Sequence, residues 1–214
     1  MGRQFRAAIV LFAVSCLAGR SAYGAPINVF GSGVSVTNGI DNHYIITSGP
    51  TAAPVINGGG SAPAYLTTIL GGNWIADNAT ASWISPNANA NQLFGLYYTY
   101  QTTFNLAGLN ATTAQLSGSL ATDDSVLVYL NGIQVLSAMD WTTSTNLSIN
   151  TNFVAGINTL SFVVSNSGGG PTGLDVALSG TANSVATPEP TAVGFIAVGS
   201  AGLALLRRKE SFQR

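Results

Sequence analysis

From Tyr97 to Ser179, the chain alternates apolar and polar side chains with a period of two residues. A strand turns successive side chains to opposite faces, whereas a helix repeats its apolar positions every three or four residues. The alternating runs are Tyr98–Phe104, Leu116–Leu120, Val126–Leu130, Leu160–Ser165 and Leu174–Ser179. No apolar stripe at helical spacing is found between Ala25 and Thr187. We therefore predict β-strands and no α-helix over this part of the chain.

Turn signals separate these runs. Asn131-Gly132 stands between Val126–Leu130 and Ile133–Leu136, and this dipeptide favours a two-residue hairpin turn. Earlier strands, joined by long loops, are expected at Asn28–Phe30, Tyr44–Thr47, Tyr65–Leu70 and Ala81–Ile84. Many short strands with turns between them predict one all-β domain, an antiparallel β-sandwich or jelly roll over residues 25–182.

Charge is confined almost entirely to the ends of the chain. Between Ala25 and Thr187 there is no Lys, Arg or Glu. The charged residues of this stretch are Asp41, Asp77, Asp123, Asp124, Asp140 and Asp175. A surface without basic residues does not neutralise phosphates, so nucleic acid is excluded as a partner. The polar surface must instead consist of Asn, Thr, Ser and Gly.

The N-terminus has the three parts of a secretory signal. Arg3 and Arg6 are followed by the apolar run Ala7–Leu17, and Ala22-Tyr23-Gly24 matches the small-x-small pattern before a cleavage site. We expect signal peptidase to remove residues 1–24, cutting between Gly24 and Ala25. The alternatives are an uncleaved helix and a lipoprotein signal at Cys16, the only cysteine.

The C-terminus also divides into three parts. A linker over residues 183–190 contains Pro188, Glu189 and Pro190, and residues 191–206 carry no charge. As a helix, that run would be roughly 24 Å long at about 1.5 Å per residue, slightly short of a typical membrane span. Residues 207–214 begin with Arg207, Arg208 and Lys209, which would remain in the cytoplasm as a basic tail. We expect a transmembrane helix; the alternative is a buried core helix.

The tripeptide, the apolar helix and the basic cluster together resemble the PEP-CTERM sorting signal of Gram-negative bacteria. The same region is also catalogued as an ice-binding protein C-terminal domain. The resemblance covers the end of the chain and departs at Thr187, where Val is common. It implies recognition by an exosortase, a membrane-embedded protease. It also implies a membrane-anchored precursor, a final place at the outer surface or in the matrix, and an association with exopolysaccharide.

A second resemblance lies within the predicted domain. Ala121–Ser125, Val128–Gly132 and Ala155–Leu160 are similar to segments of galactose-binding-like jelly rolls. This resemblance implies an accessory sugar-binding domain, with polysaccharide as the partner.

Asp123 and Asp124 form the most prominent polar pair. Neighbours on an extended chain point to opposite faces, so we do not expect a facing acid–base pair. One interpretation is a turn in which Asp accepts hydrogen bonds from nearby backbone N–H groups. The other is a Ca²⁺ site, because calcium prefers carboxylate and carbonyl oxygens.

Trp74, Trp83 and Trp141 are the candidate sugar-stacking residues. The alternative for each is a place in the core of the sandwich. Trp141 belongs to a loop-like stretch, Asp140–Thr143, and is therefore expected to be the most exposed.

Catalysis is not expected. His43 is the only histidine, and no nucleophile elbow, HExxH motif or P-loop is present. Glycoside hydrolysis would need two Asp residues brought together by folding, and ice binding would need Thr at regular spacing. We therefore predict an exported, non-catalytic surface or matrix protein that binds carbohydrate. The alternative is a structural matrix component without a small ligand.

Overall fold

The computed structural model describes residues 24–48, 61–68, 73–92, 96–167 and 169–185. The predicted signal helix, the transmembrane helix and the basic tail lie outside the described residues. Among the residues described, no helix is long and apolar enough to cross a membrane.

The described structure is all-β apart from one short 3₁₀ helix, η1. Its strands pair antiparallel throughout the described ranges. The elements are β1 (Ala25–Pro26), β2 (Val36–Thr37), β3 (Ile40–Ser48), β4 (Ala62–Leu66), β5 (Ile84–Ser85), β6 (Asn91–Gln92), β7 (Leu96–Asn105), η1 (Ala111–Thr113), β8 (Gln115–Leu130), β9 (Ile133–Ile149), β10 (Ile157–Asn166), β11 (Gly170–Pro171) and β12 (Gly173–Ala182).

The long strand β8 connects two layers of the domain. The strand order is β1-β12-β5-β4-β3-β7-β10-β8-β9, with a further pairing between β12 and β8. Residues 115–123 of β8 pair with β12, residues 125–130 pair with β10, and β9 runs beside both halves. This change of neighbour folds the sheet over on itself, as in a β-sandwich.

A single large hydrophobic core fills the space between the layers. The layer of β12 and the first half of β8 contributes Leu116 and Val176, and the neighbouring part of β9 contributes Leu147. The opposite layer contributes Tyr100 and Phe162. Burying a side chain of this size stabilises a domain by about 1.5–3 kcal/mol. The apolar residues of the alternating runs therefore face inward, as their parity predicts.

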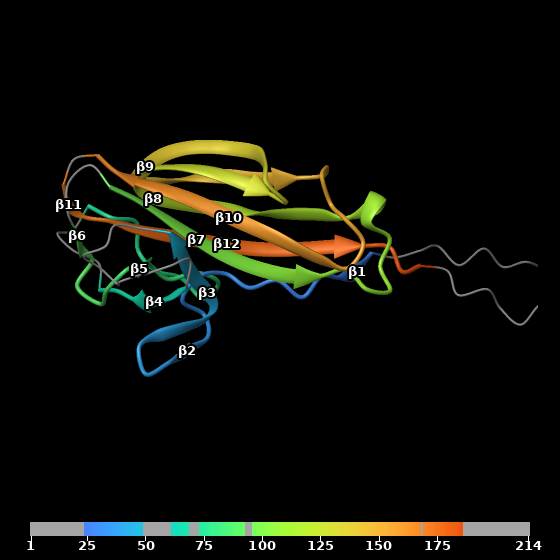
Figure 1. Ribbon diagram of the computed structural model, residues 1–214, viewed down its shortest axis with the longest axis horizontal. Coiled ribbons are helices and arrows are strands. Elements are labelled where there is room, and N and C mark those ends of the chain that lie inside the picture. Colours follow the sequence, from blue (N-terminus) through green and yellow to red (C-terminus); the bar gives the residue numbers. More distant parts are fainter. Residues whose placement is uncertain (1–23, 49–60, 69–72, 93–95, 168, 186–214) are drawn as a thin grey trace, which may run out of the picture.

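The two ends of the described domain meet. β1 pairs with the end of β12, so that Ala25 lies opposite Ala182. Figure 1 shows β1 at one end of the long axis and the β6–β11 pair at the other.

The strand predictions from Tyr97 onward are confirmed, with one substantial difference. The hairpin turn at Asn131-Gly132 forms, and both residues have the positive φ (52° and 81°) that this turn requires. However, β9 continues to Ile149, so Trp141 lies in a strand and not in a loop. The sequence does not predict this extension, because much of it is exposed on both faces of an edge strand and so lacks alternating apolar and polar residues.

The earlier part of the chain is less regular than predicted. Strands form at Tyr44–Thr47 and Ala62–Leu66, but only a two-residue strand forms near Ala81–Ile84. The segment Asn28–Phe30 is not a strand, and β1 lies just before it.

Candidate functional site

The candidate ligand- and metal-binding residues meet in one region, where residues 73–92 cover one end of the β8–β12 layer. Trp74, Trp83, Ala90 and Ala121 form a second, smaller hydrophobic cluster there. We call this cluster the tryptophan corner. Gly173 lies beneath the two indole rings, because a Cβ at this position would be 3.0–3.1 Å from their atoms.

Trp74 and Trp83 are interior residues. Their ring centroids are 4.1 Å apart, and Trp83 is fully buried. The Trp83 ring N–H donates to the Ile75 carbonyl at 2.9 Å, and the Trp74 ring N–H donates to Asp123 Oδ2 at 2.8 Å. These two rings pack against each other, so the core interpretation holds for both and neither offers an open face for sugar stacking.

Trp141 differs from the other two tryptophans. Its side chain is 36% exposed, on edge strand β9. Its carbonyl accepts a hydrogen bond from Ile75 N–H at 2.8 Å, which links β9 to the segment carrying Trp74. Stacking of a sugar on Trp141 stays a prediction.

The expected opposite orientation of Asp123 and Asp124 is wrong. Their carboxyl groups hydrogen-bond to each other, and the peptide bond between them is cis. Regular alternation fails because the pairing of β8 with β9 shifts in register between Thr122 and Val126. Asp124 Oδ2 also accepts a hydrogen bond from Ser167 Oγ at 3.0 Å.

The environment of this acidic pair favours either a shared proton or a cation. Burial, together with the hydrogen bond and the negative charge of Asp124, raises the pKa of Asp123 to about 7, against the opposing hydrogen bond from Trp74. A divalent cation beside the pair would replace the proton. Among the described residues, no three His, Cys, Asp or Glu side chains gather as a metal site. Hydroxyl, amide and carbonyl oxygens would have to complete the six to eight ligands that Ca²⁺ takes.

A second candidate surface lies on the outer side of the β7–β10–β8 layer. Its residues stand opposite one another across the three strands and so point to the same side. The rows are Tyr97–Ser165–Ser125, Thr99–Val163–Leu127 and Gln101–Ser161–Tyr129. We call this surface the tyrosine face.

The tyrosine face combines rings with uncharged hydrogen-bonding groups. Tyr97 is 64% exposed and Leu127 is 39% exposed. Gln101 Nε2 donates to Ser161 Oγ at 3.2 Å, which links the side chains of neighbouring strands on this face. Sugars bind well where a ring face lies beside neutral donors and acceptors, because their C–H faces stack and their hydroxyls form hydrogen bonds.

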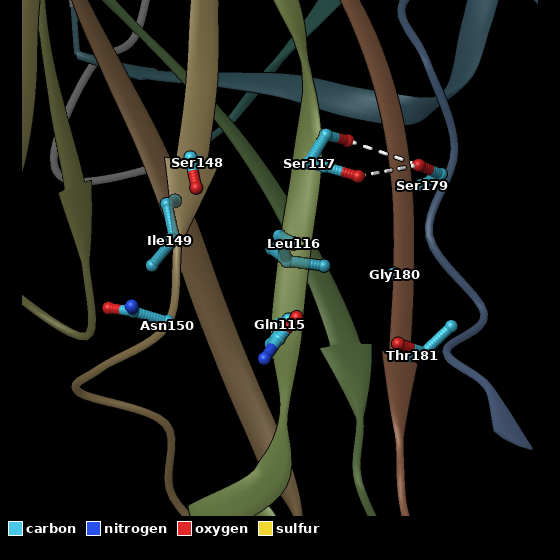
Figure 2. Close-up of a pocket in the computed structure, with 9 residues that line it drawn as sticks. All are labelled: Gln115, Leu116, Ser117, Ser148, Ile149, Asn150, Ser179, Gly180 and Thr181. Atoms are coloured by element: carbon cyan, nitrogen blue, oxygen red, sulfur yellow. Dashed lines mark hydrogen bonds between the residues drawn. The ribbon is translucent and has the colours of Figure 1, made fainter. Parts of the chain in front are cut away.

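A groove of about 220 Å³ crosses the outer side of the other layer. Figure 2 shows that its lining comes from three neighbouring strands, β9, β8 and β12. We call it the serine groove. The lining residues are Gln115, Leu116, Ser117, Ser148, Ile149, Asn150, Ser179, Gly180 and Thr181.

Sequence reasoning missed both outer surfaces. Tyr97 and Tyr129 have the parity of outward-facing residues, and that signal was available in the alternating runs. The meeting of Ser117 with Ser148 and Ser179 depends on strand order, which the sequence does not reveal.

Comparison with known proteins leaves the family open. No family model matches the sequence, and no curated protein matches it. Among solved structures, a family 11 carbohydrate-binding module from Clostridium thermocellum, in complex with a β-1,3-1,4-mixed-linked tetrasaccharide, has a TM-score of 0.41 and 10% identity, covering 78% of this chain and 100% of that one. A family 35 carbohydrate-binding module from the same organism has a TM-score of 0.33 and 16% identity, covering 55% of this chain and 86% of that one. Because these TM-scores and identities are low, the ligand of this chain has to be inferred from its own residues.

Proposed function

We propose that this chain is an exported, envelope-sorted, non-catalytic protein of the cell surface or extracellular matrix, and that its β-domain binds neutral carbohydrate. The tyrosine face is the binding surface, with Tyr97 as the stacking residue and Gln101 and Ser161 as hydrogen-bonding partners.

One observation carries the proposal: among the residues that the structure describes, the three rows of the tyrosine face present an exposed tyrosine beside hydroxyl and amide groups and contain no charged side chain. Within these three rows, an anionic ligand would find no basic group and a cationic ligand would find no carboxylate. A neutral polyhydroxylated ligand satisfies the donors and acceptors without leaving a charge unpaired.

The direct test is binding of the full-length chain, purified in a mild detergent, to a polysaccharide array. It is followed by titration with mannohexaose and with a β-1,3-1,4-mixed-linked tetrasaccharide. We expect saturable binding that weakens by roughly tenfold or more in Tyr97→Ala, because one stacked ring contributes about 1–2 kcal/mol.

The matched control is Tyr97→Phe, which keeps the ring and should stay within about threefold of the original affinity. Trp141→Ala tests the other exposed ring in the same assay. A blank array, or an affinity unchanged in Tyr97→Ala, would refute the proposed surface.

The acidic pair supports a further element of the proposal, a structural Ca²⁺ bound by Asp123 and Asp124. Added Ca²⁺ at millimolar concentration should raise the unfolding midpoint by several degrees, and chelator should reverse the rise, because an ion bound only by the folded state stabilises it. Asp124→Asn should remove the effect. An equal rise in the variant would show that calcium acts elsewhere.

The sorting part of the proposal rests on the terminal segments. Signal peptidase would act between Gly24 and Ala25, and an exosortase would act near Pro188, Glu189 and Pro190, after the membrane has held the 191–206 helix. Fractionation of cells should find the domain at the envelope or outside, without residues 1–24. Intact chain in the cytoplasm would contradict export.

A specific observation favours the second candidate, a structural matrix component. β9 lies at the edge of the sheet and exposes Ile133 (53%) and Met139 (77%). Exposed edge strands pair readily with other chains. If the array is blank, self-association measured by analytical ultracentrifugation becomes the discriminating measurement.

A further inference from the structure

The serine groove has two polar walls and a floor of backbone. Ser117 stands opposite Ser148 on β9 and opposite Ser179 on β12, which makes one row of hydroxyls across three strands. The next outward row contains Gln115 and Thr181, which are paired with each other. Alternate residues of a strand are about 6.7 Å apart, so the two rows border a channel that runs across the strands.

The floor of the groove is determined by the row between these walls. There, Leu116 stands opposite Ile149 on one side and Gly180 on the other. Leu116 and Ile149 belong to the core, so their side chains point away from the groove. A Cβ at Gly180 would lie 2.5 Å from Leu116 Cδ2, so the glycine leaves room for the leucine side chain on the core side of the strand.

The groove presents hydroxyl and amide groups and no charge. Ser117 Oγ and Ser179 Oγ are 3.0 Å apart, and Ser179 Oγ also donates to the Ser117 carbonyl at 3.2 Å. These groups bond to each other in the absence of a ligand, and each retains lone pairs for a sugar hydroxyl. The lining includes no Asp, so nothing in it attracts a cation or repels an anion; the chemistry that it matches is that of a neutral polyol.

The groove and the tyrosine face lie on opposite sides of the domain. One core separates them, with Leu116 and Val176 on the groove's layer and Phe162 and Val164 on the other. Packed sheets are about 10 Å apart, so ligands on the two outer surfaces do not collide.

We propose that the serine groove is a second carbohydrate-binding site, so that one domain holds two glycan chains and cross-links them. This inference rests on the proposed function, because it assumes a first site on the tyrosine face. It joins the two candidate roles, since a binder with two opposed sites is also a structural element of a polysaccharide matrix.

The experiment is calorimetric titration of the full-length chain in mild detergent, with mannohexaose and with the β-1,3-1,4-mixed-linked tetrasaccharide. The original chain should bind two oligosaccharides. The double variant Ser117→Ala, Ser179→Ala should bind one, and Tyr97→Ala should also bind one. Ser144→Ala, an exposed serine of β9 outside both surfaces, is the matched control and should bind two.

A second measurement tests the cross-linking itself. Turbidity of a long mixed-linkage β-glucan should rise on mixing with the original chain, and the rise should be lost in either single-site variant. Thermal unfolding of each variant establishes that it is folded.

The outcomes separate the two proposals. One oligosaccharide per chain, lost in Tyr97→Ala and unchanged in the serine double variant, overturns the second site and leaves the proposed function standing. One oligosaccharide lost only in the serine double variant overturns both the cross-linking and the tyrosine face as the binding surface. Absence of any binding overturns both proposals.

Discussion

At the scale of single residues, Asp175 is the least expected group in the domain. It lies on β12 opposite Ala121, beneath the segment that forms the tryptophan corner, and only 3% of its surface is exposed. Its Oδ2 finds no hydrogen-bond partner among the described residues. Burial and, to a lesser extent, the negative charge of Asp77 raise the pKa of Asp175 to about 7. The neutral acid is therefore favoured in the folded protein.

This residue predicts the pH dependence of stability. The folded pKa of Asp175 exceeds its unfolded value of 3.8. Its contribution to the free energy of unfolding is therefore fully present below about pH 4 and is lost as pH rises through about 7. Asp175→Asn should raise the unfolding midpoint at pH 8 by roughly 5 °C and change it little at pH 4. Thermal unfolding followed by circular dichroism, in chelator, measures both values.

Asp140 provides a control with the opposite sign. Hydrogen bonds from the Thr143 and Thr142 side chains and from Thr142 N–H lower the pKa of Asp140 to about 2. The contribution of Asp140 to the free energy of unfolding is present above its unfolded pKa and is lost as pH falls toward about 2. Asp140→Asn should not stabilise the domain at pH 8. An equal gain in both variants would show that burial of Asp175 is not the cause.

At the scale of elements, a network of asparagines joins the β8–β9 turn to the loop before β10. Asn131 Nδ2 donates to Asn158 Oδ1 at 2.9 Å, and Asn131 Oδ1 accepts from Thr159 N–H at 2.9 Å. Asn158 is fully buried, and its Nδ2 donates to the carbonyls of Val154 and Gly156. One side chain thus satisfies several backbone groups that would otherwise be buried unpaired.

Replacing Asn158 should therefore be costly. We expect Asn158→Ala to lower the free energy of unfolding by about 2–4 kcal/mol, since it leaves buried donors and acceptors unpaired. Asn105→Ala is the matched control: its exposed side chain accepts one bond, from Ala107 N–H, so the loss should stay below about 1 kcal/mol. Urea unfolding of both variants measures the difference, and similar losses would refute the network's importance.

The elements also show what the sequence predicts and what it does not. In Tyr98–Phe104 and Leu160–Ser165, every second residue points into the core. The sequence identifies these residues correctly, because the two strands pair without a register shift and keep the period of two. Parity fails at Asp123–Ser125, where the pairing slips and brings two carboxyls together. The burial of Trp74 and Trp83 was one of two open alternatives, and it depends on residues 73–92 folding onto a distant layer, a contact that no local pattern encodes.

At the scale of the whole molecule, the domain contains no Lys, Arg or Glu. Among the residues that the structure describes, ion pairs with lysine or arginine are therefore impossible, and stability derives from the core and from neutral hydrogen bonds. Between charged side chains, only repulsion among carboxylates remains, and the favourable contribution of an ionised group such as Asp140 comes from hydrogen bonds to neutral donors.

Salt should therefore have little effect. Between about 20 and 300 mM NaCl, we expect the unfolding midpoint to change by no more than about 2 °C, with any change upward, because salt screens repulsion and there is no attraction to weaken. Affinity for a neutral glycan should be equally constant. Differential scanning calorimetry measures the first, and a clear fall in midpoint with salt would contradict this account.

The pairing of Ala25 with Ala182 decides how the domain would stand on a surface. Because these two residues are paired, the start and the end of the domain lie at the same end of the molecule, and attachment of one determines the position of the other. Asp123 stands opposite Gly173 at the far end of β12, roughly 30 Å away at about 3.3 Å per residue. A tether at the end of the domain where β1 pairs with β12 would therefore place the acidic pair and the tryptophan corner at the opposite end, facing away from the surface.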